Sequence, residues 1–171
     1  EVGSHTKSFS VALRSALRED PDVILVGEMR DLETVSLALT AAETGHLVFG
    51  TLHTNSAPET IDRIIDAYPH EQQAQVRTML ATSLAAVVTQ TLVRKEGSSG
   101  RVAAHEIMIV NAALRNLIRE NKLYQIPSIM QASKGEGMQL MANSIRKLVE
   151  RGVISRQRAV SVTNNPRLFD E

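Results

Sequence analysis

Cysteine, tryptophan and long apolar runs are absent from this sequence of 171 residues, and other aromatic residues are scarce. The lack of cysteine excludes disulfides and thiolate metal sites. No apolar run reaches membrane-spanning length and no signal peptide opens the chain, so we expect a cytoplasmic protein with no direct membrane insertion. Aromatics make up 3% of the residues, and 19 Lys and Arg balance 19 Asp and Glu. Both facts argue against nucleic acid as the partner.

The stretch Asp20–Asn55 carries most of the information. Two apolar runs, at 23–26 and 46–52, are rich in β-branched or large aliphatic residues and predict strands. A helical pattern lies between them, with Asp31 as its N-cap and Gly45 after its last turn. In a parallel βαβ unit the carboxyl ends of both strands meet at one edge of the sheet. The side chains that follow the strands, which are Glu28, Asp31, His53 and Asn55, should therefore converge.

The remaining pattern predicts an α/β protein that becomes helical toward its end. A helix should follow Ser8, and a Ser56–Glu59 capping box should start another. Helices are further expected at 71–82, 112–120, from Pro127, at 138–151 and at 156–161. Residues 84–93 are ambiguous and are interpreted as helix passing into a strand near 91–94, followed by a hairpin tip at 95–100 and a return strand at 101–110. We expect a core over residues 1–110, a helical lobe over 111–163 and a frayed tail over 164–171.

Glu28 is the first candidate for chemistry. A carboxylate directly after a buried strand can orient a water molecule or support a bound Mg²⁺ during nucleotide hydrolysis. The alternative is an ordinary turn carboxylate. Gly27 precedes it where nucleotide-hydrolysing enzymes usually have an aspartate, which weakens direct metal ligation, so we assign no metal ligand in this chain.

Two histidines flank the second predicted strand. His46 and His53 are seven residues apart, which corresponds to roughly 20 Å along a strand, so they cannot bind one metal ion together. His53 leaves the strand at the same edge as Glu28 and is placed to donate to a γ-phosphate. His46 enters the strand at the opposite edge, where a plain polar strand start is the alternative. Thr54 and Asn55 follow His53, and Ser56 is better explained as a helix cap.

The arginines near these predicted elements are weaker candidates for a functional role than Glu28 and His53. Arg14, Arg18, Arg30 and Arg63 could each reach a phosphate in a neighbouring subunit, as arginine fingers do, and each is individually better explained as a surface charge. The motif G-x-x-x-x-G-K-[ST] occurs nowhere in the chain. The backbone amides and lysine that hold the β- and γ-phosphates are therefore missing. By its residues alone, the chain contains half of a nucleotide site.

Three segments resemble a known family. Residues 20–31, DPDVILVGEMRD, resemble the Walker B segment of type II/IV secretion ATPases, and residues 44–57, TGHLVFGTLHTNSA, resemble their His box. Residues 113–120, ALRNLIRE, resemble the signature helix of the branch that retracts type IV pili. The resemblance extends over essentially the whole chain.

The resemblance implies a truncated RecA-like ATPase core with a mostly parallel sheet. It further implies ATP and Mg²⁺ as cofactors, and a homohexamer that powers pilus retraction and twitching motility. It implies that Glu28 is the catalytic Walker B glutamate and that His53 and His46 belong to the His box. Gly27, Asp31, His46, Thr54 and Asn55 are expected to lie around the nucleotide. The implied partner is a platform protein at the pilus base, and the implied location is the inner face of the bacterial inner membrane.

The departures from the family are all N-terminal. In the family a PAS-like domain, the Walker A loop and an acidic Asp box come before the residues seen here. We therefore expect this chain to be a C-terminal portion with little or no turnover alone. Alternatives are a pilus-assembly or type II secretion ATPase, and a ring or interaction module that does not hydrolyse ATP. The absence of cysteine and the 113–120 helix favour retraction, because many relatives in the other branches carry a four-cysteine metal loop.

Overall fold

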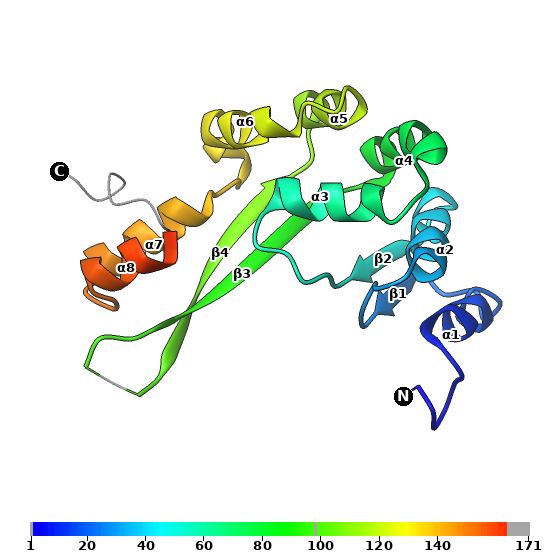
Figure 1. The fold of residues 1–171 in the computed structure, drawn as a ribbon, viewed down its shortest axis with the longest axis horizontal. Coiled ribbons are helices and arrows are strands. Elements are labelled where there is room, and N and C mark those ends of the chain that lie inside the picture. The colour runs from blue at the N-terminus through cyan, green and yellow to red at the C-terminus, as the bar shows by residue number, and fades with distance from the viewer. Residues whose placement is uncertain (1, 98, 164–171) are drawn as a thin grey trace.

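Two separate strand pairs organise the chain in the computed structural model, which describes residues 2–97 and 99–163. The first pair is parallel and the second is an antiparallel hairpin. The α/β class is confirmed, and the mostly parallel sheet that we expected is represented by the first pair only. Figure 1 shows the hairpin as a long ribbon, with the parallel pair beyond one end of it and the last two helices beside the other.

The N-terminal part is the expected βαβ unit. Helix α1 (Phe9–Ala16) precedes β1 (Val23–Val26), α2 (Leu32–Glu43) and β2 (Leu47–Gly50). Strands β1 and β2 pair in register from Val23–Leu47 to Val26–Gly50. One face of β1 packs on α1 and α2 in a small apolar cluster, because alternate strand residues point to the same side. The other face is open.

Helices and the hairpin build the largest core. α3 (Ala57–Asp66) and α4 (His70–Ser83) precede β3 (Ala86–Arg94) and β4 (Arg101–Ile109). α5 (Ala112–Arg119) and α6 (Ile126–Ala132) pack into the same cluster as α3 and α4. Short 3₁₀ turns, η1 (Leu123–Gln125) and η2 (Lys134–Glu136), lie before and after α6. The amphipathic spacing of α5 explains its place, because Leu114, Leu117 and Ile118 are all buried.

The last helices pack on the outer half of the hairpin. α7 (Met141–Glu150) and α8 (Arg156–Thr163) bury Ile145, Leu148 and Ala159 against Val93 and Ala104. The division at residues 110 and 111 stays a prediction, although the largest core draws side chains from both sides of it. The expected tail at 164–171 lies outside the described residues, as does Ser98 in the hairpin tip.

Three predicted boundaries are wrong. Strand β3 begins at Ala86 rather than near Thr91, because Val87, Val88 and Thr89 are β-branched and pair with β4. Strand β2 ends at Gly50 instead of Leu52, although Met29 N still donates to Thr51 O at 3.0 Å. Helix α7 begins at Met141 instead of Met138, since Gln139 exchanges two backbone hydrogen bonds with Ile107 and is held beside β4.

Candidate functional site

The loops after β1 and β2 are fastened to each other beyond the strands. Thr51 Oγ1 donates to Gly27 O at 2.5 Å, and Met29 N donates to Thr51 O. Gly50 leaves room for the Met29 side chain beside these loops, because a Cβ there would lie 2.6 Å from Met29 Cε. The two polar loops that follow the strands are therefore held side by side, as the βαβ topology predicts.

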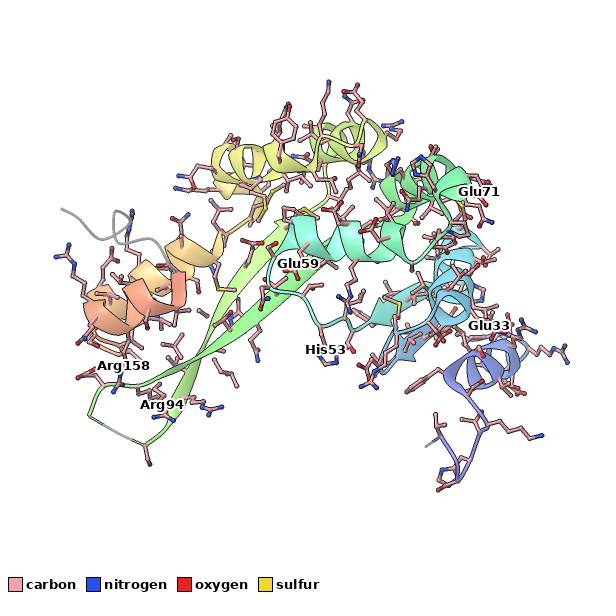
Figure 2. All side chains as sticks on the ribbon, in the orientation of Figure 1. Glu33, His53, Glu59, Glu71, Arg94 and Arg158 are labelled. Carbon is pink, nitrogen blue, oxygen red and sulfur yellow. The ribbon has the colours of Figure 1, made fainter. Side chains whose placement is uncertain are left out.

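Glu28 and His53 meet at this edge. His53 Nε2 lies 2.6 Å from Glu28 Oε1, and Arg30 Nε lies 2.5 Å from the same oxygen. The Glu28 side chain is 18% exposed, whereas those of His53 and Arg30 are 81% and 72% exposed. Figure 2 shows His53 on the connection between β2 and α3. A largely covered carboxylate is thus flanked by an imidazole and a guanidinium that both reach solvent.

The charge state of Glu28 follows from these contacts. The hydrogen bond from Arg30 lowers the pKa of Glu28 most. Desolvation opposes it with the next largest effect, and the hydrogen bond from His53 lowers the pKa further. The contact with Glu28 raises the pKa of Arg30. Glu28 is therefore ionised at neutral pH, which is the state in which a carboxylate can orient a water molecule or accept a proton.

Asp31 holds the helix that follows. Its Oδ1 accepts from Thr34 N at 2.8 Å and its Oδ2 accepts from Thr34 Oγ1 at 2.9 Å. The backbone hydrogen bond from Thr34 is the main reason why the pKa of Asp31 is lowered. Both oxygens therefore serve the N-terminus of α2, and the side chain does not reach toward Glu28 and His53.

His46 lies at the opposite edge of the parallel pair. It immediately precedes β2, and its Nδ1 lies 3.0 Å from Ala41 O and 3.2 Å from Thr44 Oγ1. These contacts close the C-terminal end of α2. The structure thus separates His46 from the Glu28–His53 contact, in agreement with the strand-length argument.

Thr54 and Asn55 connect the site to α3. Thr54 Oγ1 shares a 2.7 Å hydrogen bond with Thr60 Oγ1, and Asn55 N donates to Glu59 Oε2 at 2.9 Å. Ser56 caps α3 as expected, since its Oγ accepts from Glu59 N. The reciprocal contact of the capping box differs from the usual form, because Glu59 accepts from Asn55 instead of from Ser56 itself. Asn55 is exposed and follows the site without contacting Glu28.

The fit of the site to a nucleotide with Mg²⁺ is partial. The described residues contain no group of three or more His, Asp and Glu side chains that could hold a metal ion. Glu28 alone provides a carboxylate there, which suits a second-layer contact to a hydrated ion. Gly27 leaves open space, because an added Cβ would meet only the Phe9 ring, at 3.9 Å. Sequence reasoning missed the Arg30–Glu28 pair, although a cation two residues after the acid was the available signal.

Residues 3–161 match the sequence profile of the family described as "Type II/IV secretion system protein". The chain belongs to this family. Within the family, it is 59% identical over 169 residues to the "Type IV pilus retractation ATPase PilT" of Pseudomonas aeruginosa, covering 99% of this chain and 49% of that protein. It is 58% identical to a "Twitching motility protein" of Neisseria gonorrhoeae, covering 93% of this chain and 42% of that one.

Solved structures of the family agree with the fold. A crystal structure of the "Pilus Retraction Motor PilT and Bound ADP" matches with a TM-score of 0.88 and 56% identity, covering 98% of this chain and 47% of that one. The Legionella pneumophila ATPase DotB matches with a TM-score of 0.83 and 30% identity, covering 96% of this chain and 44% of that one. This secretion-family chain spans about half the length of the relatives that it matches.

Proposed function

We propose that this chain is part of an ATPase motor that powers type IV pilus retraction, and that it supplies one wall of the ATP site. The observation that carries the proposal is the 2.6 Å contact between Glu28 and His53, at adjacent strand ends. It occurs in a chain that is 59% identical to a pilus retraction ATPase. Glu28 orients the attacking water as a carboxylate, and His53 donates to the phosphate region.

The other wall belongs to the rest of the protein. This chain has no glycine-rich phosphate loop, so the β- and γ-phosphates and Mg²⁺ are held by other residues of the intact motor. When bound, Mg²⁺ neutralises phosphate charge, and the contribution of this chain is to place Glu28 and His53 beside it. The open space at Gly27 suits close approach of such a group.

The exposed apolar surface supports the same division of the ATP site between this chain and the rest of the protein. Val23, Leu25, Leu47 and Phe49 form one face of the β1–β2 pair, and their exposed fractions are 54%, 74%, 49% and 54%. A pocket of about 390 Å³ continues this surface between β2 and the start of β3. Contiguous apolar patches are uncommon on proteins that act alone. The remaining half of the protein covers this face and completes the ATP site.

Assembly and location extend the proposal. The motor is a homohexamer that acts on a platform protein at the pilus base, at the cytoplasmic face of the inner membrane. No helix within residues 2–97 and 99–163 is long and apolar enough to cross a membrane. A second candidate, a ring or interaction module without hydrolysis, is favoured by the absent phosphate loop in these residues.

The deciding experiment is Glu28→Gln in the intact protein, with ATP binding and phosphate release measured separately. Loss of a positioned base costs about 10²- to 10⁴-fold in rate, so phosphate release should fall by at least 100-fold while ATP binding is kept. Glu33→Gln is the matched control, because Glu33 is also paired with an arginine, Arg14, at 2.7 Å. Unchanged hydrolysis in Glu28→Gln removes Glu28 from the chemistry, whereas no phosphate release from the unsubstituted intact protein supports the non-hydrolysing module.

A further inference from the structure

Glu106 is a buried acid in the middle of an apolar strand. It lies on β4 between Ala104 and Met108, which point to the same side, and it is 6% exposed. A carboxylate in such a place must be compensated by hydrogen-bond donors, because burying an unpaired charge costs several kcal/mol. The donors identify what Glu106 does.

Its two oxygens bind the first residues of two helices from distant parts of the chain. Glu106 Oε1 accepts from Ala57 N at 2.8 Å, and Glu106 Oε2 accepts from Met141 N at 3.3 Å. Ala57 is the first residue of α3 and Met141 is the first residue of α7. Negative charge at a helix N-terminus is favourable, so one carboxylate stabilises both helices at once.

For α7 this is a substitute cap. Its N-cap residue is Leu140, which makes no side-chain capping hydrogen bond. The acceptor is supplied instead by Glu106 on the neighbouring strand. The backbone of Leu140, with φ −75° and ψ 149°, and the bonds between Gln139 and Ile107 hold the start of α7 beside β4.

For α3 the contact reaches the candidate ATP site. Ala57 lies four residues after His53, and Thr89, which stands opposite Glu106 in the hairpin, donates to Asn55 O at 3.4 Å. The loop that carries His53 is thus fastened to the hairpin through Thr89 and Glu106. The same carboxylate binds the first residue of α7, on which α8 packs.

We propose that Glu106 is a positioning residue that couples the His53 loop to the C-terminal helices α7 and α8. Displacement of α7 removes one of the two donors of Glu106 and loosens the start of α3. In the same way, displacement of the start of α3 removes the other donor and loosens the start of α7. The link from this coupling to hydrolysis depends on the proposed function, whereas the coupling itself does not.

Hydrogen exchange of the intact protein tests the coupling through a pair of variants at one position. Met141→Pro removes the donor N–H, and the start of a helix after an extended residue tolerates proline. Met141→Ala makes a comparable change of side chain and keeps the N–H. We expect exchange of the amides of Ala57, Glu59 and Thr60 in α3 to become about tenfold faster in Met141→Pro, on the scale of one lost hydrogen bond to a charged group, and to stay unchanged in Met141→Ala.

Glu106→Gln tests the same coupling by changing the acceptor instead of the donor. An amide keeps one acceptor and turns the other atom into a donor, so exchange should become faster at the start of α3 or α7, while α2 is unaffected. Equal exchange at Ala57, Glu59 and Thr60 in Met141→Pro and Met141→Ala overturns the coupling, whatever the activity. In the same samples, Glu106→Gln should lower kcat for ATP more than it changes KM. If exchange is coupled but Glu28→Gln leaves hydrolysis intact, the proposed function fails and the coupling stands.

Discussion

Leu25 gives the sharpest prediction about the open face of the β1–β2 pair. Its side chain is 74% exposed on the open face of β1, next to Phe49 on β2. We expect Leu25→Ala to destabilise the intact protein strongly, because the proposed function places another part of the protein over this face. The free energy of unfolding distinguishes a face that is covered in the intact protein from one that is open to solvent.

The magnitude follows from burial. Fully burying a leucine side chain is worth about 2 kcal/mol in transfer free energy, so a side chain that is about one quarter covered accounts for roughly 0.5 kcal/mol. A leucine enclosed in a core costs about 2.7–5 kcal/mol when truncated to alanine, because a cavity remains. The covered and the open face therefore differ by at least about 2 kcal/mol for the same substitution.

Urea unfolding of the intact protein, with two reference variants, measures this difference. Leu114→Ala on α5 provides the upper reference, since Leu114 is 0% exposed. Val11→Ala on α1 provides the lower one, with Val11 at 46% exposure. If Leu25→Ala shifts the free energy of unfolding as little as Val11→Ala does, while Leu114→Ala has its full effect, the face is open in the intact protein and the reasoning is refuted.

Two further predictions concern the charged groups at the strand ends. Because the folded pKa of Glu28 lies below its ordinary value of 4.5, the stabilisation from its ion pair is present above that value. This stabilisation is lost as the pH falls through the lowered folded pKa of Glu28, and an NMR titration of the Glu28 carboxyl measures that pKa. Arg30→Met should raise the pKa of Glu28. If the pKa does not rise, Arg30 is not the cause of the lowering. Asp31→Ala should cost about 1 kcal/mol through loss of the α2 cap, read as faster amide exchange in the first turn of α2. Asp31→Asn, which keeps an acceptor for Thr34 N, should retain most of that protection, and equal loss in both variants would contradict the capping role.

The edge at which β1 and β2 both end was predictable, although the last residue of β2 was not, because the sequence carries local signals for the two strands. Apolar runs that stop at Gly27 and Leu52, with a capped helix between, are enough to define a βαβ unit and the edge where Glu28 and His53 meet. The start of β3 was not predictable in the same way. Residues 84–93 suit both helix and strand, and pairing with β4 decides between them.

The partners of polar side chains depended on tertiary contacts. Arg30 and His53 bind one oxygen of Glu28, and nothing in their spacing shows which oxygen or that both share it. Glu106 had a weaker signal, a single acid in the run VAAHEIMIV. Its donors come from positions 57 and 141, which only the packing of α3 and α7 on β4 brings together.

The sequence by itself determined the α/β class, the family resemblance and the lack of a phosphate loop, because periodicity, capping residues and motifs are local properties of the chain. It also determined that Glu28 and His53 lie at one edge, through the topology of a parallel βαβ unit. The N-cap role of Asp31 was also predicted from the sequence. The tertiary structure alone decided that His46 contacts the C-terminal end of α2, that Arg30 holds Glu28 ionised, and that Glu106 joins two helices. The physical reason is that hydrogen-bond partners and burial depend on which distant segments pack together, and local sequence does not specify this.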